Sequence, residues 1–221
     1  MDLILVRHGE SEANAEGRLQ GSLDYPLSER GRAQARQLAA FLRAAGVTWH
    51  HAYASPLRRA TETGEIVCSL SGAAPPTPEL DLHEIRAGSL EGMTKSEIEA
   101  QRPEFAQRGV MDLGDFAEFG GEGYDSVQAR IDALLGRLIQ RHEPDDECAI
   151  LFGHGGVNFQ FLKRVICRPV PRICIVRMGN CSVTRVKLRE RRGTFMGELV
   201  FHLPIEMMGE VGSVDTGALF R

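Results

Sequence analysis

The sequence predicts an α/β fold, a three-layer α/β/α sandwich around a mostly parallel sheet with an antiparallel edge. Three observations predict it. The apolar runs at 3–6 and 148–152 are the kind of strand that is buried on both faces of a parallel sheet. Strand-like and helix-like segments alternate over the first two-thirds of the chain. The last third contains strand-like segments in succession, which is typical of an antiparallel edge.

The first half of the chain contains two predicted helices and three predicted strands. After the strand at 3–6, apolar residues recur at helical spacing between Ser28, a plausible N-cap, and Gly46, a plausible stop. A strand follows at 51–54, and a second helix starts at Ser55 with Pro56 in its first position. The proline-rich stretch 71–78 is predicted to be a surface connection, and a short strand is predicted near 79–82.

The second half begins with a segment that is helical in places but broken by Pro103, Gly109 and Gly114. We interpret it as a helical insertion near 93–122 over the active site. An amphipathic helix is predicted at 125–142, and strands at 148–152, 173–177, 181–188 and 194–202. We expect one domain over 1–221, with a mobile tail at 209–221.

Composition excludes several classes of function. The chain has 221 residues and a net charge of -4, so it lacks the basic surface of a nucleic-acid binder. No uncharged stretch approaches the length that spans a bilayer, and we expect a cytoplasmic protein without a membrane partner. The five cysteines form no Cys-x-x-Cys pair, which favours small buried side chains in a reducing compartment over disulfides or a zinc knuckle.

Unusual polar residues follow three of the predicted strands. Arg7 and His8 follow the first, Arg58 and Arg59 lie one helical turn after the second, and His154 follows the strand at 148–152. Ligands of open α/β sheets bind outside the carboxyl ends of the strands, so these residues are expected to share one rim. Arginines beside glycine-rich helix starts supply what an anionic phosphoryl group requires.

A histidine among such donors has a chemical use beyond binding. A neutral imidazole is a good nucleophile toward phosphorus, and Glu84 is a candidate acid for the leaving group. Each residue alone has a plainer interpretation as a surface group, and only their joint placement favours catalysis. A metal site on His8, His154 and Glu84 is disfavoured, because the arginines repel a divalent cation and further ligands are missing.

Several sequence strings together resemble one known family. They are RHGESEAN at 7–14, GRLQG at 17–21, PLSERGRAQA at 26–35, SPLRRATET at 55–63, LHE at 82–84, LEG at 90–92 and GHGG at 153–156. In this order they resemble the histidine phosphatase superfamily, which includes cofactor-dependent phosphoglycerate mutases and many small phosphatases. The resemblance implies the phosphoglycerate mutase-like fold.

The resemblance also implies roles for individual residues. His8 would be the nucleophile that is transiently phosphorylated, and Glu84 the general acid and later the base. The residues implied to hold the phosphoryl group or the substrate are Arg7, Asn14, Gln20, Gly21, Arg59, His154 and Gly155. No metal ion and no organic cofactor are expected.

Departures from the family pattern concern the surroundings of the site. Gly123 stands where a serine is usual after Gly-Gly-Glu, and Gly153 where a serine or threonine is common. Both should alter helix capping and supporting hydrogen bonds more than the reaction. Arg86 and Lys95 are candidates for binding a second anionic group of the substrate, although both cations can equally be solvated.

The expected function is hydrolysis of a small phosphate monoester, which makes a small phosphorylated metabolite the expected partner. Mutases of the family carry a longer insertion with an arginine pair, which this chain lacks between Glu84 and His154. Lys95 does match a mutase substrate contact, so phosphoglycerate mutase activity is one alternative. A non-catalytic module that binds a phosphorylated ligand is another. The antiparallel edge strands mildly favour a homodimer.

Overall fold

The computed structural model describes residues 1–101, 103, 115–142, 147–167, 176–191 and 194–208. Its strands are β1 (Asp2–Arg7), β2 (His51–Ala54), β3 (Thr77–Pro78), β4 (Cys148–Gly153), β5 (Val183–Arg191) and β6 (Thr194–Leu203). Its α-helices are α1 (Glu12–Ala15), α2 (Glu29–Ala44), α3 (Arg58–Leu70), α4 (Lys95–Gln101), α7 (Tyr124–Arg141) and α8 (Gly155–Ile166). Short 3-10 helices cover Leu80–Leu82, Gly88–Leu90, Ala117–Phe119 and Ile205–Met207.

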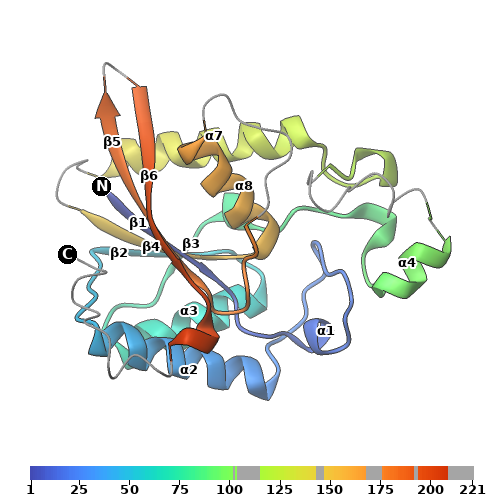
Figure 1. The fold of residues 1–221 in the computed structure, drawn as a ribbon, viewed down its shortest axis with the longest axis horizontal. Coiled ribbons are helices and arrows are strands. Elements are labelled where there is room, and N and C mark those ends of the chain that lie inside the picture. Colours follow the sequence, from blue (N-terminus) through green and yellow to red (C-terminus); the bar gives the residue numbers. More distant parts are fainter. Residues whose placement is uncertain (102, 104–114, 143–146, 168–175, 192–193, 209–221) are drawn as a thin grey trace.

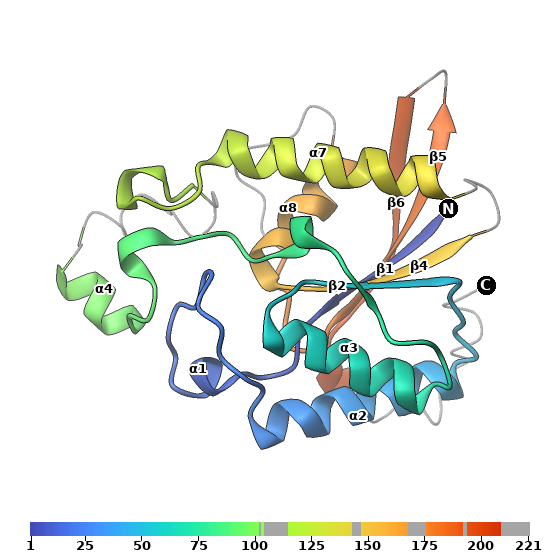
Figure 2. The ribbon, with the colours of Figure 1, turned by 180° about the vertical axis from the view of Figure 1, so that it is seen from behind.

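The strands form one six-stranded sheet in the order β3-β2-β4-β1-β5-β6. The first four strands of that order are parallel, whereas β5 pairs antiparallel with both β1 and β6. Helices α2 and α3 cover one face of the sheet, and α7 and α8 cover the other (Figures 1 and 2). The predicted sandwich with an antiparallel edge is therefore confirmed.

Strand β1 lies at the centre of the sheet and is buried on both faces. Leu3 and Leu5 belong to the apolar core under α7 and α8. Ile4 and Val6, which point the other way, belong to the core under α2 and α3. This alternation explains why the strand reads as a continuous apolar run, and each such side chain contributes about 1.5 to 3 kcal/mol through burial.

The predicted helix between Ser28 and Gly46 is α2. The Ser28 hydroxyl accepts the Gly31 N–H as an N-cap, and Gly46 has the left-handed φ of 66° that ends many helices. The predicted helix at 125–142 is α7, shifted by one residue. Gly123 is its N-cap and offers no side chain to cap the helix, as the departure from the family pattern suggested.

Helix α3 begins later than predicted, at Arg58, and Pro56 is not in its first turn. Its N-cap is Leu57, which offers no side-chain acceptor. The Asp24 carboxylate caps it instead, since its Oδ1 accepts the Arg58 N–H at 2.7 Å. That contact joins residues 34 positions apart, so local sequence could not reveal it.

The prediction of a strand near 79–82 is also wrong. The strand is β3 at Thr77–Pro78, inside the stretch predicted to be an irregular connection, and Leu80–Leu82 is a 3-10 helix. The strand forms because Thr77 and Pro78 pair with Tyr53 and Ala54 of β2. It lies at the edge of the sheet, where a proline costs no ladder hydrogen bond.

The remaining predictions concern the second half of the chain. The strands at 181–188 and 194–202 are confirmed as β5 and β6. Of the strand predicted at 173–177, residues 173–175 lie outside the described residues, and 176–177 are not in a strand. The tail at 209–221 and most of the middle of the insertion lie outside them too. No helix among the described residues is long and apolar enough to cross a membrane.

Candidate active site

The carboxyl ends of β1, β2 and β4 bring the predicted polar residues to one edge of the sheet. Arg7 pairs with Gly153 in the β1–β4 register, so the residues that follow, His8 and His154, are neighbours. Their ring centroids are 5.1 Å apart in an edge-to-face arrangement. Ser55, directly after β2, donates its N–H to the Phe152 carbonyl of β4 and so lies at the same edge of the sheet.

His8 is held as a neutral imidazole with one defined tautomer. Its side chain is 2% exposed, and Nδ1 lies 2.6 Å from the Gly9 carbonyl oxygen. Because a carbonyl only accepts, Nδ1 carries the proton and the lone pair is on Nε2. Burial, followed by the charges of Arg7 and Arg59, lowers the pKa of His8 well below 6.5. Nε2 is therefore available as a nucleophile at neutral pH.

His154 is likewise buried and neutral. The Arg59 Nε donates to its Nδ1 at 3.1 Å, so Nε2 carries the proton and lies 2.8 Å from the Ser55 hydroxyl. Burial and then the charge of Arg59 lower the pKa of His154 well below 6.5. The ring thus adds a hydrogen-bond donor to the site without adding a charge.

Arg59 is fully buried and anchored by three residues from two parts of the chain. Besides His154, its guanidinium donates to the carbonyls of Leu23, at 2.7 Å, and Gly21, at 2.9 Å. Burial lowers its pKa to about 10, which still leaves it charged at neutral pH. Three of its five N–H groups are used in this way, and two remain to bind an anion.

Arg7 has a donor without an acceptor. Its Nη1 donates to the Met178 carbonyl at 2.5 Å, but its Nε is buried and has no hydrogen-bond partner among the described residues. Gly155 lies beside that nitrogen, and even a Cβ at this position would be 3.5 Å from it. An unpartnered buried guanidinium N–H is costly, and an oxyanion is the kind of acceptor that would satisfy it.

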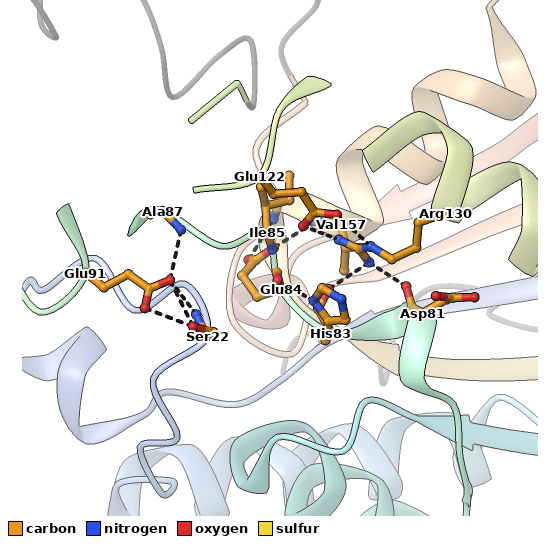
Figure 3. A network of polar contacts seen from close by, with 11 residues as sticks. Ser22, Asp81, His83, Glu84, Ile85, Ala87, Glu91, Glu122, Arg130 and Val157 are labelled. Atoms are coloured by element: carbon orange, nitrogen blue, oxygen red, sulfur yellow. Dashed lines mark hydrogen bonds and ion pairs between the residues drawn. The ribbon is translucent and has the colours of Figure 1, made fainter. Parts of the chain in front are cut away.

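Glu84 is fixed at the N-terminus of α8. One oxygen accepts the N–H groups of Ile85 and Val157, both at 2.9 Å, and the other accepts that of Gly156 at 3.0 Å (Figure 3). The negative charge of Glu84 also acts on both Arg7 and Arg59. Glu84 therefore lies beside the candidate phosphate clamp, by which we mean Arg7, His8, Arg59 and His154.

A buried ion pair supports the segment that carries Glu84. Arg130 binds both oxygens of Glu122, at 3.0 and 2.9 Å, and its Nη1 donates to the carbonyls of Asp81 and His83 (Figure 3). Burial alone would raise the pKa of Glu122, but the hydrogen bonds and the charge of Arg130, together with the nearby His83 and Arg86, lower that pKa. Sequence reasoning did not predict Arg130, because nothing in its helix marks it out.

The loop with Gln20 and Gly21 is shaped by its own hydrogen bonds. The Gln20 side chain accepts the Ser11 hydroxyl at 2.7 Å. Gly21 has a φ of 51°, and a Cβ there would overlap the Glu91 carboxylate, which accepts the N–H groups of Ser22 and Ala87 (Figure 3). Only glycine combines a left-handed φ with the absence of a Cβ, and this lets the backbone of the loop come close to a ligand.

Asn14 and the turn at 179–181 lie beside the backbone of His8. The Asn14 Oδ1 accepts from the Ser11 N–H and from Asn180, which leaves its Nδ2 to bind a substrate oxygen. Asn180 also donates to the His8 carbonyl at 3.1 Å. Cys181, with a left-handed φ of 51°, donates its N–H to the carbonyls of Arg7 and His8. Sequence reasoning missed this turn, whose signal is the Gly-Asn pair at 179–180.

The two candidate specificity residues are not part of this cluster. Arg86 is exposed, and Lys95 is 89% exposed with its Nζ 3.5 Å from Glu99 on the same helix, α4. Their role in specificity stays a prediction. The departure at Gly153 has a structural cause, because a Cβ there would collide with the Asn158 side chain, which donates to the Val6 carbonyl.

Three of the described cysteines have thiols with raised pKa values. Burial raises the pKa of Cys68 to about 11 and those of Cys148 and Cys181 to about 12. These three thiols are therefore protonated and poor nucleophiles at neutral pH, in agreement with the interpretation as small apolar side chains.

Comparisons with known proteins find relatives over most of the chain. The family model of the histidine phosphatase superfamily (branch 1) matches residues 3–197. A probable phosphoglycerate mutase of Salmonella typhi is 29% identical over 219 residues, which is 99% of this chain and 97% of that protein. Phosphoglycerate mutase-like protein 4 of Arabidopsis thaliana is 33% identical over 188 residues, covering 85% and 79%.

Solved structures show the same fold. A mycobacterial glucosyl-3-phosphoglycerate phosphatase, in complex with VO3, has a TM-score of 0.79 and 28% identity over 90% of this chain and 96% of that one. YhfR of Bacillus stearothermophilus has a TM-score of 0.75 and 31% identity, covering 90% and 95%.

Proposed function

Because the chain belongs to the histidine phosphatase superfamily, branch 1, we propose that it is a phosphatase that hydrolyses a small phosphate monoester through a phosphohistidine on His8. The observation that carries this proposal is the state of the clamp. A neutral, buried imidazole with its Nε2 lone pair available lies among arginine donors, one of which has no protein acceptor. Phosphoryl transfer needs both a nucleophile and a positive clamp for the equatorial oxygens.

The first half of the reaction forms the phosphohistidine. The His8 Nε2 attacks phosphorus, a P–N bond forms, and the P–O bond to the leaving group breaks in line. Glu84, in its protonated form, gives the leaving alkoxide its proton. The guanidinium groups of Arg7 and Arg59 hold the equatorial oxygens throughout the transfer, and His154 keeps Arg59 in place by accepting its Nε–H.

The second half returns the enzyme to its starting state. Glu84, now a carboxylate, takes a proton from a water molecule whose oxygen attacks phosphorus. The P–N bond breaks, its electron pair returns to the His8 Nε2, and inorganic phosphate leaves. The proton stays on Nδ1, which donates it to the Gly9 carbonyl in a hydrogen bond during both steps, so the ring needs no change of tautomer.

The similarity to a phosphatase of known structure supports hydrolysis. The second candidate function is phosphoglycerate mutase activity, in which a second substrate hydroxyl replaces the water. The observation that favours it is the description of curated relatives as phosphoglycerate mutases or mutase-like proteins. Both functions share the first half of the reaction and differ in the acceptor.

The test is phosphate release from a panel of monoesters that includes 3-phosphoglycerate, measured in the presence of a chelator. We expect release that survives chelation and is lost in His8→Asn, because Asn keeps a donor for the Gly9 carbonyl but offers no nucleophilic nitrogen. His50→Gln, which changes an exposed histidine outside the clamp, is the matched control. An acid-labile, alkali-stable phosphoprotein should accumulate in wild type during turnover. Interconversion of 2- and 3-phosphoglycerate without phosphate release would instead establish the mutase.

A further inference from the structure

A second cluster of histidines lies at the opposite edge of the sheet from the phosphate clamp. His51 is the first residue of β2, Glu147 directly precedes β4, and His142 directly follows α7. The clamp lies at the other end of β4, six residues away along the strand. At about 3.3 Å per residue, about 20 Å separates the two clusters, so the catalytic arrangement does not explain this one.

Three donor atoms converge in this cluster. The Glu147 Oε2 lies 3.0 Å from the His142 Nδ1 and 3.3 Å from the His51 Nε2. One such atom from each residue lies within 4.8 Å of the other two. The imidazole rings of His51 and His142 have their centroids 3.9 Å apart.

The same three atoms lack hydrogen-bond partners. Each is buried, and none forms a hydrogen bond of normal geometry with any described residue. The His142 side chain is only 4% exposed, so solvent does not compensate its Nδ1. Buried polar atoms without partners are rare in proteins and indicate a missing ion or water.

The surroundings hold the His142 ring in the orientation of a metal ligand. Its Nε2 lies 2.8 Å from the Tyr53 hydroxyl, which fixes the ring and turns Nδ1 toward Glu147. Histidines that bind metal ions usually have their second ring nitrogen in a hydrogen bond of this kind. The hydrogen bond to Tyr53 therefore leaves the His142 Nδ1 as the atom that faces the shared carboxylate.

We propose that His51, His142 and Glu147 bind a Zn²⁺ ion at this edge of the sheet. Zinc bonds of about 2.0 to 2.2 Å in tetrahedral geometry place neighbouring ligand atoms about 3.3 Å apart. The two measured separations of 3.0 and 3.3 Å fit that edge length. Two imidazole nitrogens with one carboxylate select zinc over magnesium or calcium, which prefer oxygen ligands alone.

The ion would tie the end of α7 to the starts of β2 and β4. The side chains of His51 and Glu147 are 36% and 28% exposed, so water can take the fourth coordination position. The ligands come from three separate segments of the chain, which is why no spacing motif in the sequence predicts the site. We assign the ion a stabilising role, separate from the reaction at His8.

Zinc binding to the chelator-treated full chain, measured by calorimetry and by elemental analysis after dialysis, tests this proposal. We expect one Zn²⁺ per chain, and Co²⁺ in its place should give the visible absorption of a four-coordinate site. Glu147→Gln and His51→Gln should each weaken binding on the order of 100-fold, at least as much as the loss of a supporting residue does. Because both side chains are partly exposed, both variants should fold, unlike a replacement of buried His142.

Two variants serve as controls. His50→Gln changes a histidine at the same edge, and His8→Asn removes one from the clamp, and both should keep one zinc ion. Zn²⁺ should raise the melting temperature of wild type but not of Glu147→Gln. No stoichiometric binding, binding unchanged in Glu147→Gln and His51→Gln, or binding lost in His8→Asn would each overturn the proposal. Phosphatase activity should be unchanged by removal of the ion, so this test is independent of the proposed reaction.

Discussion

Gly156 is the position where a single methyl group should test the role of Glu84. A Cβ at Gly156 would lie 2.7 Å from the Glu84 Oε1 and 3.2 Å from its carboxyl carbon. Ordinary contacts begin at 3.4 Å, so in Gly156→Ala the carboxylate must move by about 0.7 Å. Positions of catalytic groups matter at this scale, since a misplacement of about 1 Å costs on the order of 100-fold in rate.

The loss should depend on the leaving group. If Glu84 protonates the leaving oxygen, Gly156→Ala should lower kcat/KM for an alkyl phosphate by about 100-fold and that for p-nitrophenyl phosphate much less, because a nitrophenolate needs little protonation. Initial rates on the two esters at fixed pH measure this ratio. Equal losses would show that Glu84 only positions the substrate, and unchanged rates would refute the placement of Glu84 beside the reacting bond.

A helix control separates this effect from stability. Gly136 lies in α7, where an added Cβ would meet no atom within 4 Å. Gly136→Ala should therefore gain up to about 1 kcal/mol in the free energy of unfolding from helix propensity, with activity unchanged. Gly156 lies in the first turn of α8, and Gly156→Ala must displace Glu84, so its unfolding midpoint should be lower than that of Gly136→Ala.

Three further predictions follow from the same contacts. Burial lowers the pKa values of His8 and His154. Below pH 6.5 the unfolded chain therefore binds more protons than the folded chain, and the free energy of unfolding should fall by up to about 2.7 kcal/mol per pH unit as the pH drops. Urea midpoints that stay constant from pH 7.5 to 5.5 would contradict this. His8→Asn should remove turnover but retain the near-native circular dichroism spectrum, and residual turnover above background would refute the nucleophile. Glu122→Ala should lower the free energy of unfolding, measured with urea, by about 3 to 5 kcal/mol, because it leaves the guanidinium of Arg130 buried without its carboxylate partner. A decrease of less than about 1 kcal/mol would show that solvent compensates that charge.

Local patterns predicted the parts of the fold that local physics determines. The apolar run of β1 and the helical spacing of α2 and α7 depend on neighbours within one turn or one strand, and these elements were found within a residue or two. The start of α3 depends on Asp24 and the strand at Thr77 depends on β2, and both were misplaced. Contacts between distant residues determined these elements, and the sequence near them carries no trace of such contacts.

The same distinction applies to the site. His8, Arg59 and His154 could be placed together because parallel strands end at one edge of a sheet. Asn180 could not, since its place behind His8 depends on a turn that leads into the antiparallel strand β5. The metal-ligand cluster was missed for a related reason, because its residues lie at the starts of strands, where ligands of this fold class are not expected.

Arg130 and Arg137 differ from the clamp arginines in the partners they have. Arg130 binds Glu122, and Arg137 binds Glu79 and Asp81, so their charges are neutralised within the protein. The clamp arginines, Arg7 and Arg59, donate to backbone carbonyls and to one imidazole, and the described residues form no ion pair with either. Carbonyls fix a guanidinium in place without cancelling its charge. The positive potential of the clamp is therefore preserved, and binding of the dianionic phosphoryl group of the proposed substrate would neutralise the charges that folding has left buried.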